Sequence, residues 1–208
     1  VPSLDGVAFI DPRRSQVDIV QAVGRAIRLS EDKTIGTIII PVFLSDTDDP
    51  DTALSDSEFE PVWSILRALR SHDDALGEAL DGIRTSMGRG GGGGLPPKIV
   101  IDVPKVVSTH FVDVIKTRVV EATTSTWEFN FGLLQQFVAR ERHPHVPQKH
   151  VELCNGGEVR LGVWVNTCRT KKRRGTLPSE RIALLEGVSD WAWDRPAEVW
   201  RLMLKGLD

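Results

Sequence analysis

The feature that most constrains the fold is a run of mainly β-branched residues, GTIIIPVFL, over residues 36–44. A continuous apolar run of this length is typical of a strand buried on both faces of a sheet. A shorter segment, VAFI at residues 7–10, predicts another strand. Between the two, apolar residues of segment 16–29 recur at helical spacing, with Ser15 as the N-cap. Strand, helix and parallel strand in this order predict a unit of a doubly wound α/β sheet.

The composition is that of a soluble globular protein, with 40% hydrophobic and 26% charged residues among 208. No apolar run reaches the roughly 20 residues that cross a bilayer, and the first residues lack the pattern of a secretory signal. Two cysteines, Cys154 and Cys168, argue against a disulfide framework and fit a reducing compartment. We therefore expect a cytoplasmic protein without a membrane partner. The absence of an initial Met indicates that the natural N-terminus lies upstream.

Charge divides the chain into an acidic front and a basic back. Residues 1–123 hold 13 Lys and Arg against 19 Asp and Glu, whereas residues 124–194 hold 10 against 8. Such an asymmetry indicates different partners for the two parts.

The middle of the chain predicts a helical extension over residues 58–123. After an acidic loop, one long helix is expected from Glu58 to Met87, with Pro61 in its first turn. Its near-heptad apolar stripe could pair with a partner chain, which would make the protein an interaction scaffold, or pack within this chain. A Gly-rich hinge at 88–97 follows. A strand over 98–103 and a helix over 106–121 complete the extension.

The last part predicts three short helices within residues 124–194. Their apolar positions include Trp127 and Phe131 in the first, Trp164 in the second and Leu185 in the third. Residues 195–208 begin a further apolar helix that is cut off. The expected fold class is therefore an α/β fragment with a long helix, followed by an all-α three-helix bundle.

The sequence Gln-Ala-Val-Gly-Arg-Ala-Ile-Arg at residues 21–28 carries the clearest chemical signal. Arg25 and Arg28 lie three positions apart, so one helical face presents both guanidinium groups to one site. Permanently charged, bidentate groups suit the charge that develops on phosphate oxygens during phosphoryl transfer. Gly24 permits close backbone approach, and Gln21 offers an amide. The same spacing also occurs on ordinary solvated helix faces.

With its flanking strands, the segment from Val7 to Phe43 resembles the end of the second RecA-like domain of superfamily-two helicases of the DEAD/DEAH type. In that family the last helicase motif reads Q-x-x-G-R-x-x-R, and residues 1–5 resemble the tail of the preceding motif. The resemblance implies that Arg28 is an arginine finger and Arg25 a second γ-phosphate contact. It also implies that Gln21 and Gly24 are supporting positions in the nucleotide site.

A second resemblance, over residues 124–194, is to the helicase-associated domain, a three-helix module that follows such motors in bacterial proteins. One departure is Arg142, which stands where the family usually has Gly. The residues that carry the resemblance are Trp127, Phe131, Leu134, Phe137, His145, Val146, Pro147, Leu161, Gly162, Trp164, Val165, Arg169, Gly175, Leu177, Arg181, Leu185, Gly187 and Trp191.

The sequence contains neither G-x-x-x-x-G-K-[ST] nor D-E-x-[DH]. These motifs hold ATP and Mg²⁺ on the other wall of a helicase cleft, so an N-terminal RecA-like domain is an expected partner. ATP and Mg²⁺ are therefore expected in the intact parent, with no cofactor bound tightly by this chain alone. We predict that this polypeptide by itself does not hydrolyse ATP.

A basic cluster at residues 169–174 comprises Arg169, Lys171, Lys172, Arg173 and Arg174. Cations here could favour a helix C-terminus or bind nucleic-acid phosphates, and five exceed what capping requires. Trp193, off the apolar stripes, is a candidate for base stacking. The histidines and cysteines of this region fit no standard zinc spacing, so no metal is expected.

The resulting hypothesis is the C-terminal portion of an ATP-dependent helicase, with residues 1–57 completing a RecA-like domain. Its module at 124–194 would bind nucleic acid, with DNA favoured over RNA. The alternative is a non-catalytic nucleic-acid-binding or regulatory protein that uses only the three-helix module.

Overall fold

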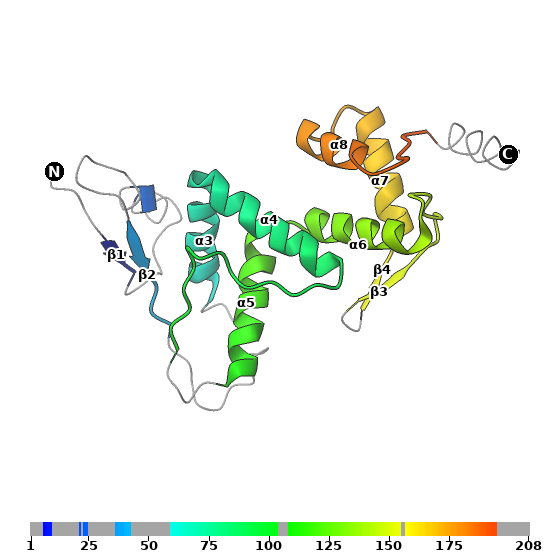
Figure 1. Cartoon of the computed structure of the whole chain (residues 1–208). Coiled ribbons are helices and arrows are strands. Elements are labelled where there is room, and N and C mark those ends of the chain that lie inside the picture. The colour runs from blue at the N-terminus through cyan, green and yellow to red at the C-terminus, as the bar shows by residue number, and fades with distance from the viewer. Residues whose placement is uncertain are drawn as a thin grey trace, which may run out of the picture. The chain divides into compact units, whose positions relative to one another are not determined.

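The computed structural model describes residues 6–9, 21, 23–24, 36–42, 59–103, 108–154 and 157–194. The chain forms two compact units, one of residues 1–84 and 93–125 and one of residues 85–92 and 126–208. In the described part, helices predominate and the strands form two small two-stranded sheets (Figure 1).

The first unit opens with a parallel strand pair. Strand β1 (Gly6–Ala8) pairs with β2 (Thr37–Ile39) in parallel, with Val7 opposite Ile38. Between them in sequence, Gln21, Val23 and Gly24 are helical, and Val23 is fully buried. The predicted parallel pairing is confirmed. The remainder of the predicted helix, including Arg25 and Arg28, lies outside the described residues.

The prediction that the second strand is buried on both faces is wrong. Ile38 and Ile40 pack with Val23 against Ile65, whereas Ile39 is 58% exposed. Successive side chains of a strand point to opposite faces, and within the described residues only one face is covered. Strand β2 is also short, since it ends before Pro41, which has no N–H for a ladder.

The predicted long helix is two helices, α3 (Glu60–His72) and α4 (Asp74–Gly88). Asp73 between them is extended, with φ −137° and ψ 94°. Its Oδ1 accepts a hydrogen bond from the Leu76 N–H at 3.0 Å, and Lys98 pairs with Oδ2. The Asp73 side chain thus caps a new helix, as Asp does at many helix starts, and the Lys98 ion pair holds the break in place.

Helix α5 (Thr109–Thr123) begins at the N-cap Ser108, whose Oγ accepts from the Phe111 N–H at 3.2 Å. It packs on α3 through a core that includes Trp63, Leu66 and Val119. The apolar stripe of α3 is therefore covered within this chain, which removes the surface that the scaffold hypothesis requires.

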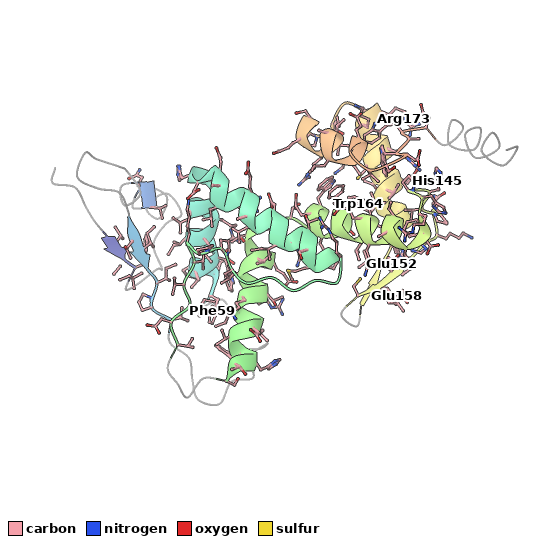
Figure 2. The ribbon with its side chains drawn as sticks, viewed as in Figure 1. Phe59, His145, Glu152, Glu158, Trp164 and Arg173 are labelled. Carbon is pink, nitrogen blue, oxygen red and sulfur yellow. The ribbon has the colours of Figure 1, made fainter. Side chains whose placement is uncertain are left out.

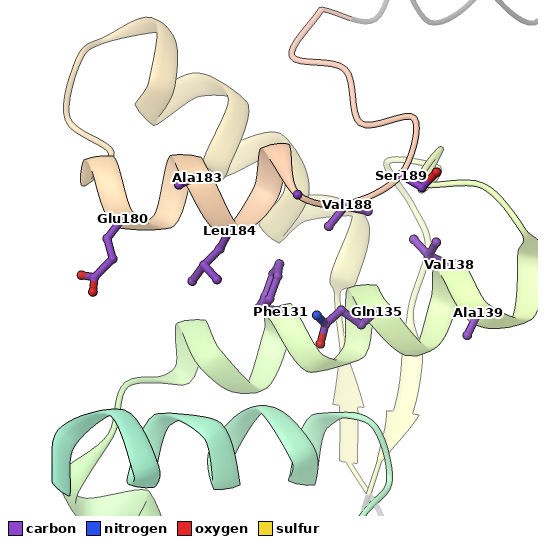
Figure 3. Close-up of a pocket in the computed structure, with 10 residues that line it drawn as sticks. Phe131, Gln135, Val138, Ala139, Glu180, Ala183, Leu184, Val188 and Ser189 are labelled. Carbon is purple, nitrogen blue, oxygen red and sulfur yellow. The ribbon is translucent and has the colours of Figure 1, made fainter. Parts of the chain in front are cut away.

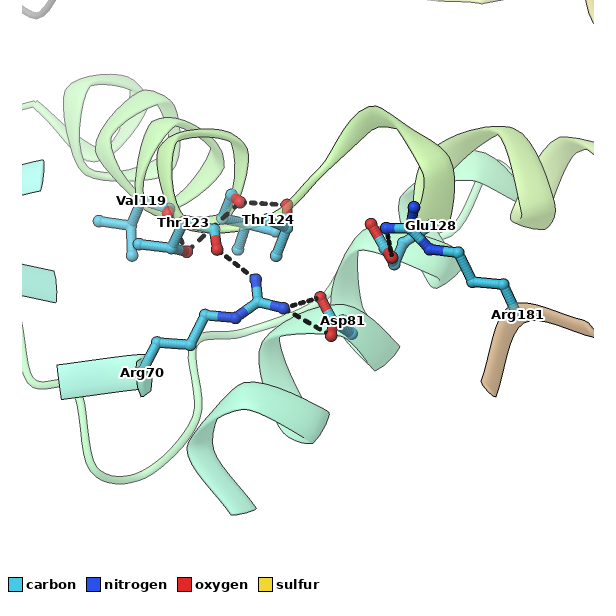
Figure 4. A network of polar contacts seen from close by, with 8 residues as sticks. Arg70, Asp81, Val119, Thr123, Thr124, Glu128 and Arg181 are labelled. Atoms are coloured by element: carbon cyan, nitrogen blue, oxygen red, sulfur yellow. Dashed lines mark hydrogen bonds and ion pairs between the residues drawn. The ribbon is translucent and has the colours of Figure 1, made fainter. Parts of the chain in front are cut away.

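Arg70 on α3 connects this helix to α4 and α5 (Figure 4). Its guanidinium donates to both carboxylate oxygens of Asp81 on α4, at 2.7 and 2.8 Å, and to the Thr123 carbonyl at the end of α5. Nη2 makes both contacts with Asp81, and hydrogen bonds between an ionised arginine and a carboxylate are roughly twice as strong as neutral ones. This contact joins α3 to α4 across the break at Asp73.

The strand predicted over residues 98–103 does not form. A turn at Pro97 and Lys98 is closed by the Ile99 N–H, which donates to the Pro96 carbonyl at 2.8 Å. Ile99 packs into the α3–α5 core, while Val100 is 83% exposed. Residues 98–103 therefore form a loop that packs on α3 and α5. Neither of the two sheets in the described part of the chain includes this segment.

The second unit contains α6 (Thr126–Glu141), α7 (Leu161–Arg173) and α8 (Ser179–Glu186), which confirms the three predicted helices. Its core includes Phe131, Leu134, Leu161 and Leu185 with Trp127, and Trp164 packs against it. The unit is not all-α, because β3 (Glu152–Cys154) and β4 (Gly157–Val159) form an antiparallel hairpin before α7. No helix in the described part is long and apolar enough to span a membrane.

Residues 85–92 belong to this second unit, where they cross α6 at two glycines. A Cβ on Gly132 would lie 2.1 Å from the Thr85 carbonyl oxygen, and one on Gly88 would lie 2.1 Å from the Phe129 carbonyl oxygen. Arg89 Nε donates to Gln135 Oε1 at 2.7 Å beside this crossing. The backbones approach so closely that neither position tolerates a side chain.

Arg142 follows α6 in the left-handed conformation, with φ +64°, and its N–H donates to the Val138 carbonyl at 2.8 Å. This is the residue that replaces the family's usual glycine. A left-handed residue just after a helix is commonly glycine because a Cβ is unfavourable there. The turn is therefore kept despite the substitution, at a conformational cost.

We expect Arg142→Gly to stabilise the protein by about 0.5–1 kcal/mol, because glycine relieves this cost but adds entropy to the unfolded chain. Lys149→Gly is the control, since Lys149 is an exposed loop residue without positive φ. Glycine relieves no cost at this position and only adds entropy to the unfolded chain, so this variant should be less stable than the wild-type protein. Urea denaturation midpoints would measure both. Equal destabilisation of the two variants would contradict the assignment of strain to Arg142.

Candidate nucleic-acid interface

The predicted nucleotide-site residues are only partly visible in the structure. Arg25 and Arg28 lie outside the described residues. Gln21 is exposed on its helix, and Gly24 is half-buried with no atom within 4 Å of an added Cβ. Val23, between them, anchors this helix to the strand pair. Close backbone approach at Gly24 therefore has no partner within the described part of the chain.

The end of α7 presents cations to solvent. Lys171, Arg173 and Arg174 are exposed, and Figure 2 shows Arg173 at the opposite end of α7 from Glu152. The helix ends at Arg173 with Arg174 as its C-cap, and Gly175 follows with φ +69°. The N–H of Thr176 donates to the Lys171 carbonyl at 2.9 Å, which is the Schellman arrangement. This fixed turn holds three cations together at the negative end of a helix dipole.

The other two predicted cations are structural. Arg169 is only 7% exposed, with its Nε donating to the Ala192 carbonyl at 3.3 Å and its guanidinium 5.4 Å from the Trp191 ring centroid. Lys172 lies 5.3 Å from the Trp193 ring centroid and 3.7 Å from Glu186 Oε1. They hold the segment after α8 onto α7. Arg169, which was predicted to bind nucleic acid, therefore lies on the inner face of α7 and not with the exposed cations.

Trp193 is held in the same contact and is not an open stacking surface. Its Nε1 donates to Glu186 Oε1 at 2.9 Å, and its ring meets that of Trp191 edge-on at 5.5 Å. With Lys172 over its face, the ring is already engaged within the protein. The structure thus favours a packing role for Trp193.

A groove of about 750 Å³ lies between α6 and α8 (Figure 3). Its walls are largely apolar and bring no acid–base pair together. The lining residues include Phe131, Gln135, Val138, Glu180, Leu184 and Val188. This arrangement suits apolar contact and offers no catalytic chemistry.

The charged group that sequence reasoning missed is Glu152, which is buried at the start of the hairpin. Its Oε1 accepts from Arg140 Nη2 at 2.7 Å and lies 2.8 Å from His150 Nε2. The hydrogen bond with Arg140 holds the pKa of the Glu152 carboxyl below its usual value, and the contact with His150 adds to this. These contacts tie the loop before the hairpin to the end of α6.

Replacing Glu152 with Gln should remove about 1–3 kcal/mol of stability at neutral pH, because a charge-assisted pair is lost. A lowered pKa in the folded state gives stability that is present above the unfolded-state pKa and lost as pH falls through the folded value. The wild-type protein should therefore lose this advantage on acidification, so the difference between the two denaturation midpoints should shrink as the pH falls below the unfolded-state pKa of about 4.3. A constant difference between them at all pH values would contradict this role of Glu152.

The cysteines and histidines of this unit show no metal arrangement in the described residues, where no group of three or more His, Cys, Asp or Glu side chains converges. Burial raises the pKa of the Cys168 thiol to about 11. Cys168 is therefore a core residue with little thiolate character at neutral pH. His150 packs edge-on against Phe137 at 4.9 Å.

Comparison with known proteins identifies the second unit. Residues 124–194 match the family model described as HA, the helicase associated domain. This confirms the resemblance of residues 124–194 to the helicase associated domain that their motifs indicated. No curated protein matches the chain.

One solved structure to which the chain is similar is "ATP-dependent Type ISP restriction-modification enzyme LlaBIII bound to DNA". The identity is 29%, the TM-score 0.47, and the alignment covers 69% of this chain and 10% of that one. The chain spans about a tenth of the length of that enzyme.

Proposed function

We propose that this chain is the C-terminal portion of an ATP-dependent nucleic-acid helicase. The match of residues 124–194 to the helicase associated domain carries the proposal. The parallel strands β1 and β2, with a helical segment between them in sequence, support it as the last part of a RecA-like domain. The Q-x-x-G-R-x-x-R motif of that segment supplies the expected chemistry.

In this proposal, Arg28 and Arg25 contact the γ-phosphate of ATP, and Gln21 and Gly24 support the site. ATP and Mg²⁺ bind in the cleft that a RecA-like domain with a P-loop completes. Arginine neutralises the charge that develops on the phosphate oxygens as the bond to the leaving group breaks. This chain alone lacks the other wall and does not turn over ATP.

The helicase associated domain binds nucleic acid through the exposed cations of α7, which are Lys171, Arg173 and Arg174. Lysine and arginine at phosphates release counterions, so binding weakens as salt rises and depends little on sequence. DNA is the favoured partner. The second candidate function, a binding protein without a motor, rests on the same cations and predicts binding that is indifferent to ATP in the intact protein.

The test is binding of fluorescently labelled DNA to the chain over a series of salt concentrations. Replacing Lys171, Arg173 and Arg174 with Gln should weaken binding and flatten the plot of log affinity against log salt by about 0.9 for each phosphate that is no longer neutralised. The matched control replaces three exposed or half-buried cations of the first unit, Arg67, Lys116 and Arg118, with Gln. Unchanged affinity in the first variant would refute nucleic-acid binding by this cluster.

A further inference from the structure

The outward face of α7 is distinguished by its charge. The helix contains no Asp or Glu. Its buried side is formed by Leu161, Val165 and Cys168. Apart from Arg173, its exposed positions follow one helical stripe through Val163, Thr167 and Lys171, and the exposed cap residues Arg160 and Arg174 continue this stripe at the two ends. We call the five residues of this stripe the α7 outer face.

This face has cations at both ends and uncharged side chains between them. Val163 is 48% exposed, and Thr167 is exposed with its hydroxyl donating to the Val163 carbonyl at 2.9 Å. At the N-terminal end, the loop at 147–150 touches α7 at Gly162, whose N–H donates to the His150 carbonyl at 3.1 Å, so this loop brings Lys149 to the same end of the helix as Arg160. Both Lys149 and Arg160 are exposed.

Helix α8 is the alternative contact helix, since it follows α7 after a short turn as the second helix of a helix-turn-helix does. Its exposed residues include Glu180 and Glu186, while its one cation, Arg181, is paired with Glu128 at 3.1 Å. Exposed carboxylates repel phosphates. Charge therefore selects α7 over α8.

We propose that the α7 outer face lies in the major groove of duplex DNA, with its cationic ends on the two phosphate backbones that border the groove. This inference rests on the proposed nucleic-acid binding and specifies its substrate as B-form duplex. A helix of 13 residues is about 20 Å long, and the major groove is about 12 Å wide, so the two ends reach both backbones. Thr167 and Val163 then meet base edges, where a hydroxyl and a methyl group find partners.

Duplex RNA offers no equivalent groove for α7, because its major groove is too deep and narrow for side chains to reach the base edges. Single strands present one backbone and cannot engage both cationic ends in this way. The chain should therefore bind a duplex DNA of about two helical turns more tightly than duplex RNA or single-stranded DNA of the same sequence.

The decisive variant is Thr167→Asp, which places a negative charge in the middle of the α7 outer face. Threonine and aspartate have similar helix propensities, so the helix itself should be little affected. The variant should weaken duplex DNA binding at least about fivefold, the effect of one like-charge contact at 4 Å in water. The matched control is Ala183→Asp, which adds the same charge to the exposed middle of α8 and should change affinity far less. Circular dichroism would verify that both variants fold.

The second variant removes the N-terminal cations by Lys149→Gln and Arg160→Gln. It should lower the salt slope by about 1.8, since each phosphate contact contributes about 0.9. If the Lys171, Arg173 and Arg174 variant loses affinity while both of these variants bind like wild type, the cations at the C-terminal end of α7 bind nucleic acid but the rest of the α7 outer face does not, which would overturn the major-groove placement. Equal or tighter binding of duplex RNA or single strands would overturn the major-groove placement. Absence of binding to every nucleic acid would overturn the proposed binding function itself.

Discussion

Replacing Gly162 with alanine is expected to destabilise the helicase associated domain by at least about 3 kcal/mol, at the upper end of the cost of overpacking. A Cβ at Gly162 would lie 2.0 Å from the Pro147 carbonyl oxygen and 2.6 Å from that of Gln148. Both atoms belong to backbone, so no side chain can turn away. The Gly162 N–H also donates to the His150 carbonyl at 3.1 Å, which fixes the loop against α7.

The loop would have to move away from the start of α7, which would break that hydrogen bond and loosen the packing of Val146, a buried core residue. Tryptophan fluorescence during urea denaturation would follow the change, because Trp127 and Trp164 belong to this core. Gly82→Ala in α4 is the control. A Cβ at Gly82 has no atom within 4 Å, so alanine should stabilise the helix by about 0.5–1 kcal/mol. If Gly162→Ala unfolded at the same urea concentration as the wild-type protein, the close contact predicted at Gly162 would be refuted.

The elements that could be predicted from sequence are those with a strong periodic signal. The stripes through Trp127 and Phe131, and through Leu161 and Val165, locate α6 and α7 because a 3.6-residue period has one structural meaning. The break at Asp73 could not be predicted in this way. The apolar residues of α3 and α4 together mimic one continuous stripe, and the structure reveals two helices through the capping hydrogen bond of Asp73 with Leu76 and the contact between Arg70 and Asp81.

The hairpin before α7 did have a sequence signal. Asn155-Gly156 separates two runs of three strand residues, and Asn-Gly between such runs is the strongest short-range indication of a hairpin. The histidine- and proline-rich segment before it carries no period, so the role of Glu152 as the partner of Arg140 becomes visible only in the fold.

The basic cluster shows the same limit at the level of the site. Composition identifies five cations in residues 169–174, but it does not divide them between surface and core. The division follows from the phase of α7, because Leu161, Val165, Arg169 and Lys172 share the inward side. Continuing the apolar stripe to the end of the helix would have assigned Arg169 to the interior.

Replacing Arg28 with alanine in the intact parent, which supplies the P-loop domain, is expected to reduce ATP turnover by about 10³–10⁵-fold. This corresponds to about 4–7 kcal/mol of transition-state stabilisation. The effect should fall on kcat, with little change in KM for ATP, because the charge that an arginine finger neutralises develops only as the phosphoryl group leaves. Arg28→Lys should recover only part of the rate, since lysine keeps the charge but not the planar fork.

The control for this measurement is Arg67→Ala, which removes an exposed arginine whose side chain pairs with Glu60 on α3. It should leave kcat within a factor of about two, as exposed ion pairs contribute little to stability. A parent protein in which Arg28→Ala and Arg67→Ala have the same turnover would contradict the arginine-finger assignment. Nucleic-acid binding by α7 would then stand without the motor, and the domain would act as a binding module whose affinity for DNA is the same with and without ATP. Because the two hypotheses differ in this nucleotide dependence, binding to labelled duplex DNA measured with and without ATP and Mg²⁺ distinguishes them independently of any change in turnover.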